Sequence, residues 1–86
     1  MKGIMNMKGT TVQEYIVHLM DGTKIITCED IDFPAEKGLL ACFEKANSED
    51  LLLIRDLICN HYIPKRAILY ISTGDVYEIE ETLFYN

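Results

Sequence analysis

Residues 12–28, VQEYIVHLMDGTKIITC, contain the clearest structural signal in this chain. Apolar and polar side chains alternate along residues 12–20, which is typical of a strand with one buried face. Asp21-Gly22 follows, a dipeptide favoured in two-residue hairpin turns because both positions take positive φ there at low cost. Residues 23–28 are rich in β-branched side chains and predict the returning strand. We therefore expect the fold to begin with an antiparallel hairpin.

An amphipathic helix is predicted after this hairpin, over residues 35–46. Asp32-Phe33-Pro34 suits a helix start, because Asp accepts hydrogen bonds from free amides and Pro tolerates the first turn. Leu39, Leu40 and Phe43 recur at helical spacing, with charged residues between them. Gly38 costs such a helix about 1 kcal/mol relative to Ala. The helix should therefore depend on packing against the sheet.

Residues 51–60, LLLIRDLICN, are compatible with two structures. As a helix, the segment would place several apolar residues on one face, and leucine is a good helix former. As a strand, residues 51–54 form a short apolar run bounded by turn residues, as in a strand buried on both faces. The strand is the preferred interpretation.

The C-terminal third predicts two further strands. Residues 62–72, YIPKRAILYIS, contain an apolar run at 68–71 that indicates a buried strand, and Pro64 marks its start or an edge position. Residues 73–75, Thr-Gly-Asp, predict a turn, and residues 76–80 alternate as a half-exposed last strand. The pattern as a whole predicts an α+β fold: a strongly bent antiparallel sheet or a small barrel, with one amphipathic helix inserted after the first hairpin.

Length and composition favour one folded domain. The 86 residues are 49% hydrophobic and 26% charged, which excludes a disordered tail or a low-complexity linker. Residues 1–11 are expected to form a flexible N-terminal leader, and residues 12–86 a single small α+β domain. Three cysteines without paired spacing do not form a disulfide framework, and no signal peptide or membrane span is recognisable. We expect a cytoplasmic protein without membrane contact.

Charge argues against nucleic acid as a direct partner. Eight basic and fourteen acidic residues give a formal net charge of −6, which repels phosphate backbones. Lys65-Arg66, with Tyr62 and Tyr70 nearby, is the one basic patch, and a solvated loop is its preferred interpretation.

The residues that could carry chemistry are few. Cys28, Cys42, Cys59 and His61 could in principle form a zinc site, but structural zinc sites usually present their ligands in close pairs, and only one approximate pair, Cys59 and His61, exists here. Buried thiols are preferred, because free cysteine commonly packs as a small hydrophobe. A Cys59 nucleophile with His61 or His18 as base has no supporting local motif, and no phosphate-binding loop is present. We expect no cofactor, no metal and no enzymatic activity.

Two segments resemble the Sm-like family of small barrels. Residues 15–25, YIVHLMDGTKI, resemble the opening of its first motif, and residues 63–71, IPKRAILYI, have the spacing of its second. LLLIRD, residues 51–56, lies where an Sm-like third strand would. The resemblance covers about half of the chain and implies a small twisted SH3-like or Sm-like barrel. It argues against inherited RNA binding, because the family's RNA-contacting Arg-Gly pair corresponds to Pro64 and Lys65 here, and a helix replaces the motif after the second strand.

The C-terminal region supplies the candidate interaction surface. It combines carboxylates, which could imitate phosphates or simply keep the protein soluble, with apolar residues that require cover. These residues are Asp75, Glu78, Glu80, Glu81, Leu83, Phe84 and Tyr85. The second face of residues 51–58 is a further apolar surface that the core does not bury. Since a small core cannot hide all of this surface, we expect a homo-oligomer, most simply a dimer.

The sequence thus predicts a non-enzymatic protein-binding or regulatory module with an unknown protein partner, of the kind found among phage and mobile-element accessory proteins. One alternative is an acidic inhibitor that imitates nucleic acid and blocks a nucleic-acid-binding enzyme such as a defence nuclease. A further alternative is a degenerate Sm-like RNA-binding protein.

Overall fold

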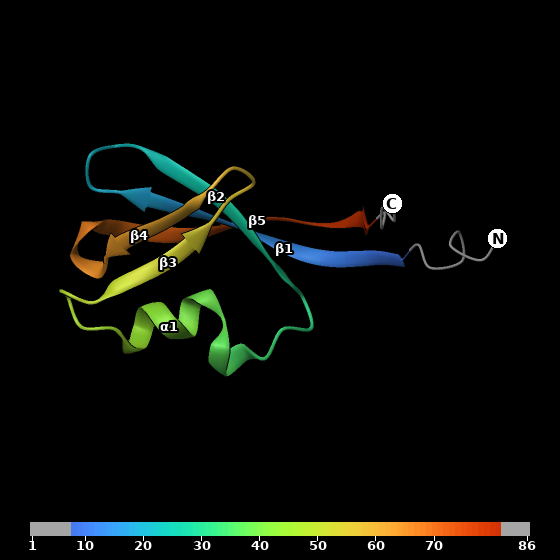
Figure 1. The fold of residues 1–86 in the computed structure, drawn as a ribbon, viewed down its shortest axis with the longest axis horizontal. Coiled ribbons are helices and arrows are strands. Elements are labelled where there is room, and N and C mark those ends of the chain that lie inside the picture. Colours follow the sequence, from blue (N-terminus) through green and yellow to red (C-terminus); the bar gives the residue numbers. More distant parts are fainter. Residues whose placement is uncertain (1–7, 82–86) are drawn as a thin grey trace.

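The computed structural model describes residues 8–81, which form five strands and one α-helix (Figure 1). Their order is β1 (Lys8–Leu19), β2 (Lys24–Asp30), α1 (Leu39–Lys45), β3 (Leu51–Arg55), β4 (Asn60–Pro64) and β5 (Ile68–Glu81). Short 3₁₀ turns, Ala35–Lys37 and Lys65–Ala67, precede α1 and β5. The predicted α+β class is confirmed.

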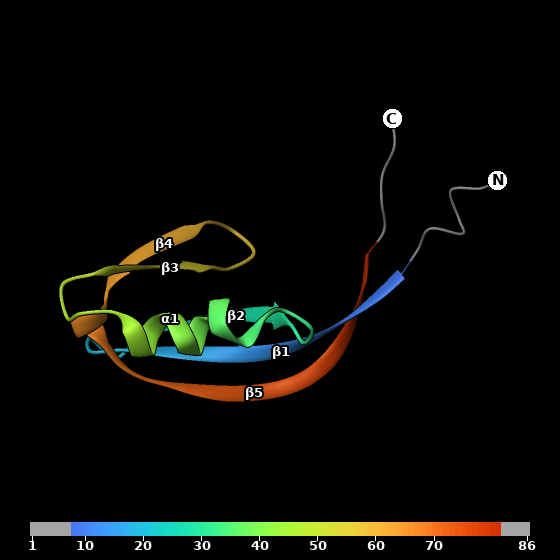
Figure 2. The same ribbon diagram turned by 90° about the horizontal axis from the view of Figure 1, so that it is seen from below.

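The strands form two antiparallel sheets that face each other. One sheet has the order β2-β1-β5, and the other is the β3–β4 hairpin. Figure 2 shows the hairpin layer over the larger sheet, with α1 beside the gap between β2 and β3, and β1 and β5 curving together along their length. Within residues 8–81, β2 and β3 share no hydrogen-bonded ladder, so these pairings do not close a barrel.

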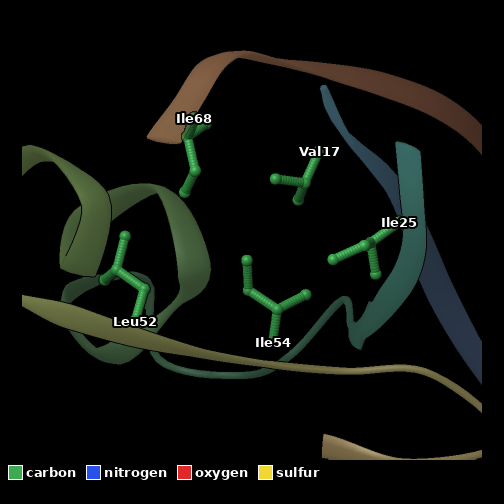
Figure 3. Packing of buried hydrophobic residues seen from close by; sticks show 5 residues of the cluster. All are labelled: Val17, Ile25, Leu52, Ile54 and Ile68. Carbon is green, nitrogen blue, oxygen red and sulfur yellow. The ribbon is translucent and has the colours of Figure 1, made fainter. Parts of the chain in front are cut away.

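The core lies between the two sheets (Figure 3). Its buried residues are Val17, Ile25, Leu52, Ile54 and Ile68. In β3, buried Leu52 and Ile54 alternate with exposed residues, as they must when successive side chains of a strand point to opposite faces. This confirms the strand for residues 51–54. It also corrects the expectation of a strand buried on both faces, because Leu51 is 63% exposed.

The first hairpin forms as predicted, but its loop is one residue longer. Leu19 N–H donates to Thr23 O at 2.9 Å, and Gly22 N–H donates to Leu19 O at 3.0 Å. Gly22 has φ 92°, and it is the one residue with positive φ between residues 8 and 81. Asp21 Oδ1 accepts the Thr23 N–H at 2.9 Å and the Thr23 hydroxyl at 2.7 Å. Because this local bonding holds Asp21 at negative φ, the loop has three residues instead of two.

Strand β1 begins four residues before its predicted start. Residues 8–11, expected in the leader, belong to β1 and pair with β5, for example Lys8 with Glu81 and Thr11 with Glu78. Local sequence pattern does not reveal this pairing, because the partners lie at opposite ends of the chain. Residues 1–7 lie outside the described range.

The predicted helix over residues 35–46 is divided at Gly38. This glycine is extended, with φ −77° and ψ 175°, and it separates the 3₁₀ turn from α1. Glu29 Oε2, from β2, accepts the Leu39 N–H at 2.6 Å and thereby satisfies a free amide of the helix start. Leu39 and Phe43 pack against the core, in agreement with the expected dependence on the sheet.

The C-terminal strands differ from prediction in two respects. Tyr62–Pro64 belongs to β4, so the predicted strand over residues 62–72 is divided by the 3₁₀ turn. Leu69 and Tyr70, expected to be buried, are 57% and 50% exposed. Both lie at a register shift between β1 and β5, where Ile68 pairs with Leu19 and Ile71 with Val17. Ile68 and Ile71 contact the core, and the two residues between them are left on the outside.

The predicted turn at residues 73–75 is a β-bulge. Strand β5 runs unbroken to Glu81, and its register with β1 shifts between Gln13 and Tyr15, which pair with Val76 and Thr73. Gln13 Nε2 donates to Gly74 O at 3.0 Å across the irregularity. A Cβ on Gly74 would collide with the Glu14 carboxylate, so glycine permits a close approach here instead of a reversal of the chain.

Candidate functional site

The turn between β3 and β4 is held by its own hydrogen bonds. Asp56 N–H donates to Cys59 O at 3.1 Å. Asp56 Oδ1 accepts the N–H groups of Ile58 and Cys59, both at 2.8 Å. These bonds, above all the one from Cys59, together with His61, lower the pKa of Asp56 to about 2. One carboxylate oxygen, Oδ1, therefore fixes the turn, and the other, Oδ2, contacts His61.

Three side chains of this turn converge on one region. His61 Nε2 lies 2.7 Å from Asp56 Oδ2 and 3.5 Å from Cys59 Sγ. The three donor atoms all lie within 4.8 Å of one another. Cys59 is exposed, whereas His61 and Asp56 are half-buried with side chains 30% and 26% exposed. We call these three residues the turn cluster. Cys59 and His61 are among the candidate ligands in the sequence, whereas Asp56 is not; its signal is the spacing Asp-x-x-Cys-x-His within a turn between two strands.

The outward side of the same hairpin is apolar. Leu53 pairs with Tyr62, so their side chains share a face, opposite to the face that Leu52 and Ile54 turn to the core. At the tip, Leu57 and Ile58 are 102% and 90% exposed. We call this exposed set the hairpin surface; it consists of Leu51, Leu53, Leu57, Ile58 and Tyr62. It includes the second face of residues 51–58 that the sequence predicted to need cover.

A cleft of about 810 Å³ lies between β2, α1 and β3. Apolar side chains of Phe33, Leu39 and Leu53 line it, together with Cys28 and Cys42. Residues of β2, α1 and β3 line it, and β2 and β3 form no ladder with each other within the described residues.

All three cysteines are exposed, which corrects the expectation of buried thiols. Cys28 lies on the outward face of β2, where the alternation that buries Ile25 leaves it in solvent. Cys42 lies on the exposed flank of α1. Among the described residues, neither takes part in the turn cluster, so the four-ligand combination of Cys28, Cys42, Cys59 and His61 is not assembled.

The predicted acidic surface is distributed along β5. Asp75 and Glu78 are exposed, and Glu80 and Glu81 occupy the end of the strand, paired through the backbone with Gly9 and Lys8. Leu83, Phe84 and Tyr85 lie outside the described residues.

One further carboxylate, missed by the sequence analysis, lies near this surface. The pKa of Tyr77 is raised, chiefly by burial and further by Cys28, Glu14 and Asp75, so Glu14 of β1 adds to the negative potential beside Asp75 of β5. The sequence could not reveal this neighbour, because it depends on the shifted register of β1 and β5.

The basic pair lies in the 3₁₀ turn Lys65–Ala67, where Arg66 is exposed, as expected for a solvated segment, and Lys65 is half-buried. Lys65 Nζ donates to Ala46 O at 2.9 Å and lies 4.9 Å from the centre of the Phe43 ring. Arg66 Nε lies 3.1 Å from Glu49 Oε1. Lys65 therefore fixes the end of α1 to the turn before β5, and the pair is engaged within the protein.

The chain matches no protein-family model, no curated protein and no solved structure. Within residues 8–81, no helix has the length and hydrophobicity to cross a membrane.

Proposed function

We propose that this chain is a non-enzymatic protein-binding module that acts through the hairpin surface. The observation that carries the proposal is the almost complete exposure of Leu57 and Ile58 at the tip of a short turn. Turns exposed to water are ordinarily polar. Burying a large apolar side chain such as Leu57 or Ile58 is favourable by about 1.5–3 kcal/mol. Contiguous exposed apolar surface of this kind marks interaction sites in soluble proteins.

The partner that fits best is a second copy of the chain. Within the described residues, β3 and β4 form a two-stranded sheet with free edges, and such a hairpin is marginally stable alone. A twofold contact would bury the same apolar face on both copies and cover an edge of each. The proposal is thus a homodimer whose contact extends to Leu51 and Leu53 at the edge of the cleft between β2, α1 and β3.

The mass of the protein in solution tests this proposal. At about 10–100 µM, where interfaces of standard size stay closed, the intact chain should have the mass of a dimer by light scattering. The Leu57→Ser/Ile58→Ser variant should be a monomer. Met20→Ser is the matched control, because Met20 is 62% exposed at the other hairpin loop. A monomeric intact chain, or a dimeric double variant, would contradict the proposal.

The C-terminal residues provide a second test of the interface. A chain truncated after Thr82 lacks Leu83, Phe84 and Tyr85, which the sequence places at or near the contact. We expect its dimer to dissociate at higher concentration than that of the intact chain in a dilution series. An unchanged dissociation midpoint would place the contact at the hairpin surface alone.

An acidic inhibitor of a nucleic-acid-binding enzyme is a second candidate. It is favoured by the lack of an ion pair at Glu14, Asp75 and Glu78 among the described side chains of β1 and β5. The ion pairs between described side chains are Asp56–His61 and Arg66–Glu49, so Glu14, Asp75 and Glu78 keep their negative potential. Inhibition of purified DNA nucleases by an excess of the protein should weaken with salt and disappear in Glu14→Gln/Asp75→Asn/Glu78→Gln. Equal inhibition by that variant would contradict this candidate.

The proposal includes an origin from the Sm-like small barrels and a location in the cytoplasm. A central β1 between β2 and β5, stacked on a β3–β4 hairpin, supports an Sm-like origin in which α1 has opened the contact between β2 and β3. A cytoplasmic location is supported by three free, exposed thiols, which persist in reducing compartments.

A further inference from the structure

The turn cluster has the spacing of ligands around a metal ion. In a tetrahedral zinc site, sulfur lies about 2.3 Å and nitrogen about 2.0–2.1 Å from the ion, which places the two ligand atoms about 3.5 Å apart. Cys59 Sγ and His61 Nε2 are 3.5 Å apart. Asp56 Oδ2 lies 2.7 Å from the same ring nitrogen, close enough to become the third ligand by a small opening of the hydrogen bond.

The arrangement differs from that of a nucleophile and its base. In a catalytic triad, one ring nitrogen faces the nucleophile and the other faces the carboxylate. Here His61 turns the same atom, Nε2, towards both Cys59 and Asp56. The three donor atoms therefore surround one point in space, which suits a single bound cation and does not suit a proton relay.

The turn holds this geometry without a metal. Asp56 Oδ1 is occupied by the Ile58 and Cys59 N–H groups, so the carboxylate plane is set and Oδ2 faces the cluster, where it contacts His61 Nε2. The register of the hairpin, with Arg55 opposite Asn60, fixes both ends of the turn. An ion can reach the site because Cys59 is exposed.

From this geometry we infer that the β3–β4 turn binds one Zn²⁺ ion through Asp56 Oδ2, Cys59 Sγ and His61 Nε2. The ligand set of one sulfur, one nitrogen and one oxygen suits Zn²⁺. It does not suit Ca²⁺ or Mg²⁺, which prefer oxygen ligands alone. On binding, water leaves the hydrated ion, the Cys59 S–H bond breaks and its proton passes to solvent, and a zinc–thiolate bond forms. His61 Nε2 gives up to solvent the proton of its hydrogen bond to Asp56, the neutral ring carries its proton on Nδ1 instead, and a zinc–nitrogen bond forms. Three protein ligands leave a fourth position for water or for a donor from a partner, next to the exposed Leu57 and Ile58.

Titration of the reduced full-length chain with Co²⁺, a spectroscopic substitute for Zn²⁺, tests the inference. We expect one Co²⁺ per chain, with a thiolate-to-cobalt charge-transfer band that Zn²⁺ abolishes by displacement. Cys59→Ser should weaken binding by more than about tenfold, since loss of even an outer partner of a metal ligand costs about 10–100-fold. Cys42→Ser is the matched control, because it removes an exposed thiol outside the cluster and should leave binding unchanged.

Asp56→Asn distinguishes the two roles of the Asp56 carboxylate, as a metal ligand through Oδ2 and as the acceptor that holds the turn through Oδ1. The Asn carbonyl oxygen can still accept the two N–H bonds of the turn, but the amide nitrogen cannot bind the ion. We expect a folded chain with weakened Co²⁺ binding. The inference is overturned if the intact chain gives no charge-transfer band, if Cys59→Ser binds as well as Cys42→Ser, or if Asp56→Asn binds with unchanged affinity.

NMR of the intact chain tests the inference without any substitution, and so remains valid if a substitution unfolds the turn. Addition of Zn²⁺ to the isotopically labelled intact chain should shift backbone amide resonances in residues 55–62 and leave those of Cys28 and Cys42 in place. Shifts centred on Cys28 or Cys42 would overturn the inference.

Discussion

At the scale of single residues, Glu29 and Gly38 show how one close contact sets the length of a helix. Gly38 lies extended where the sequence predicts helix, and Glu29 binds the first amide of α1 from the neighbouring strand. A Cβ on Gly38 would lie 2.9 Å from Glu29 Oε1, which is too close for the carboxylate to stay in place. The helix starts at Leu39 because glycine leaves room for this cap.

Gly38→Ala should therefore destabilise the protein. The methyl group displaces the Glu29 carboxylate from the Leu39 N–H, and loss of a helix cap typically costs about 0.5–2 kcal/mol. Urea unfolding measures the change, with Glu29→Gln as a control that keeps an acceptor oxygen. A stabilised Gly38→Ala protein, the result expected if only the entropy of the unfolded chain changed, would refute this account.

Asp56 should titrate at unusually low pH. Its folded pKa of about 2 lies below the ordinary 3.8, because the N–H of Cys59 and the other donors favour the ionised form. The stabilisation is therefore complete above pH 3.8 and is lost as pH falls through about 2. Carboxyl resonances in NMR should report this midpoint. It should stay below 3.8 in His61→Gln, since the backbone donors remain, and a midpoint at 3.8 would contradict the described turn.

Prediction of the turn cluster from sequence was limited by the choice of ligand types. The other cysteines, Cys28 and Cys42, lie far from Cys59 and His61 in the sequence, and this spacing does not fit a four-ligand zinc site. Asp56 is nearer in the chain, but its role depends on a reversal between Arg55 and Asn60 that is visible once β3 and β4 are paired. The exposure of the thiols likewise depends on which face of each element meets the core.

At the scale of elements, β3 explains both the success and the ambiguity of the sequence prediction. Its four consecutive apolar residues suit either a helix or a strand, and the strand forms because Leu52 and Ile54 complete the core from one face. Leu51 and Leu53 are left on the other face. The apolar run therefore reflects one buried face and one face that, by our proposal, a partner covers.

Two alanine substitutions in β3 separate these faces. Ile54, 1% exposed, should lose about 2–5 kcal/mol on substitution by alanine, through lost burial and an unfilled cavity. Leu51→Ala should change the unfolding free energy by less than about 0.5 kcal/mol in solution dilute enough to keep the chain monomeric. Equal losses for both variants in urea would show that the faces are assigned wrongly.

The β1–β5 pairing marks the limit of prediction from local pattern. Asp21-Gly22 revealed the first hairpin because its partner strands are adjacent in sequence. Gly74 predicts a turn by the same logic, yet it lies in a β-bulge. This bulge depends on the register between β1 and β5, whose paired residues are about 60 positions apart in the sequence. Local periodicity contains no information about that register.

At the scale of the whole molecule, the distribution of charge and apolar surface favours protein partners. The chain has a net charge of −6, and its basic pair is engaged, Lys65 with Ala46 and Phe43 and Arg66 with Glu49. Large apolar side chains are exposed on both sheets, whereas the buried core cluster comprises five residues. A surface of this kind repels phosphate and attracts apolar protein surfaces.

Short RNA and DNA should therefore not bind at about 150 mM salt, where non-specific binders have Kd values of about 10⁻⁴–10⁻⁶ M. Fluorescence anisotropy with labelled oligonucleotides provides the measurement. Binding in the low micromolar range would instead favour the degenerate Sm-like RNA-binding alternative.

The contact between two copies at the hairpin surface is the central claim, and intermolecular NOEs test it most directly. In a mixture of isotopically labelled and unlabelled chains, filtered spectra report only contacts between copies. We predict NOEs from the methyl groups of Leu57 and Ile58 in one copy to protons of the hairpin surface in the other. Absence of such NOEs, in a sample where methyl contacts within each chain are observed, would contradict the account.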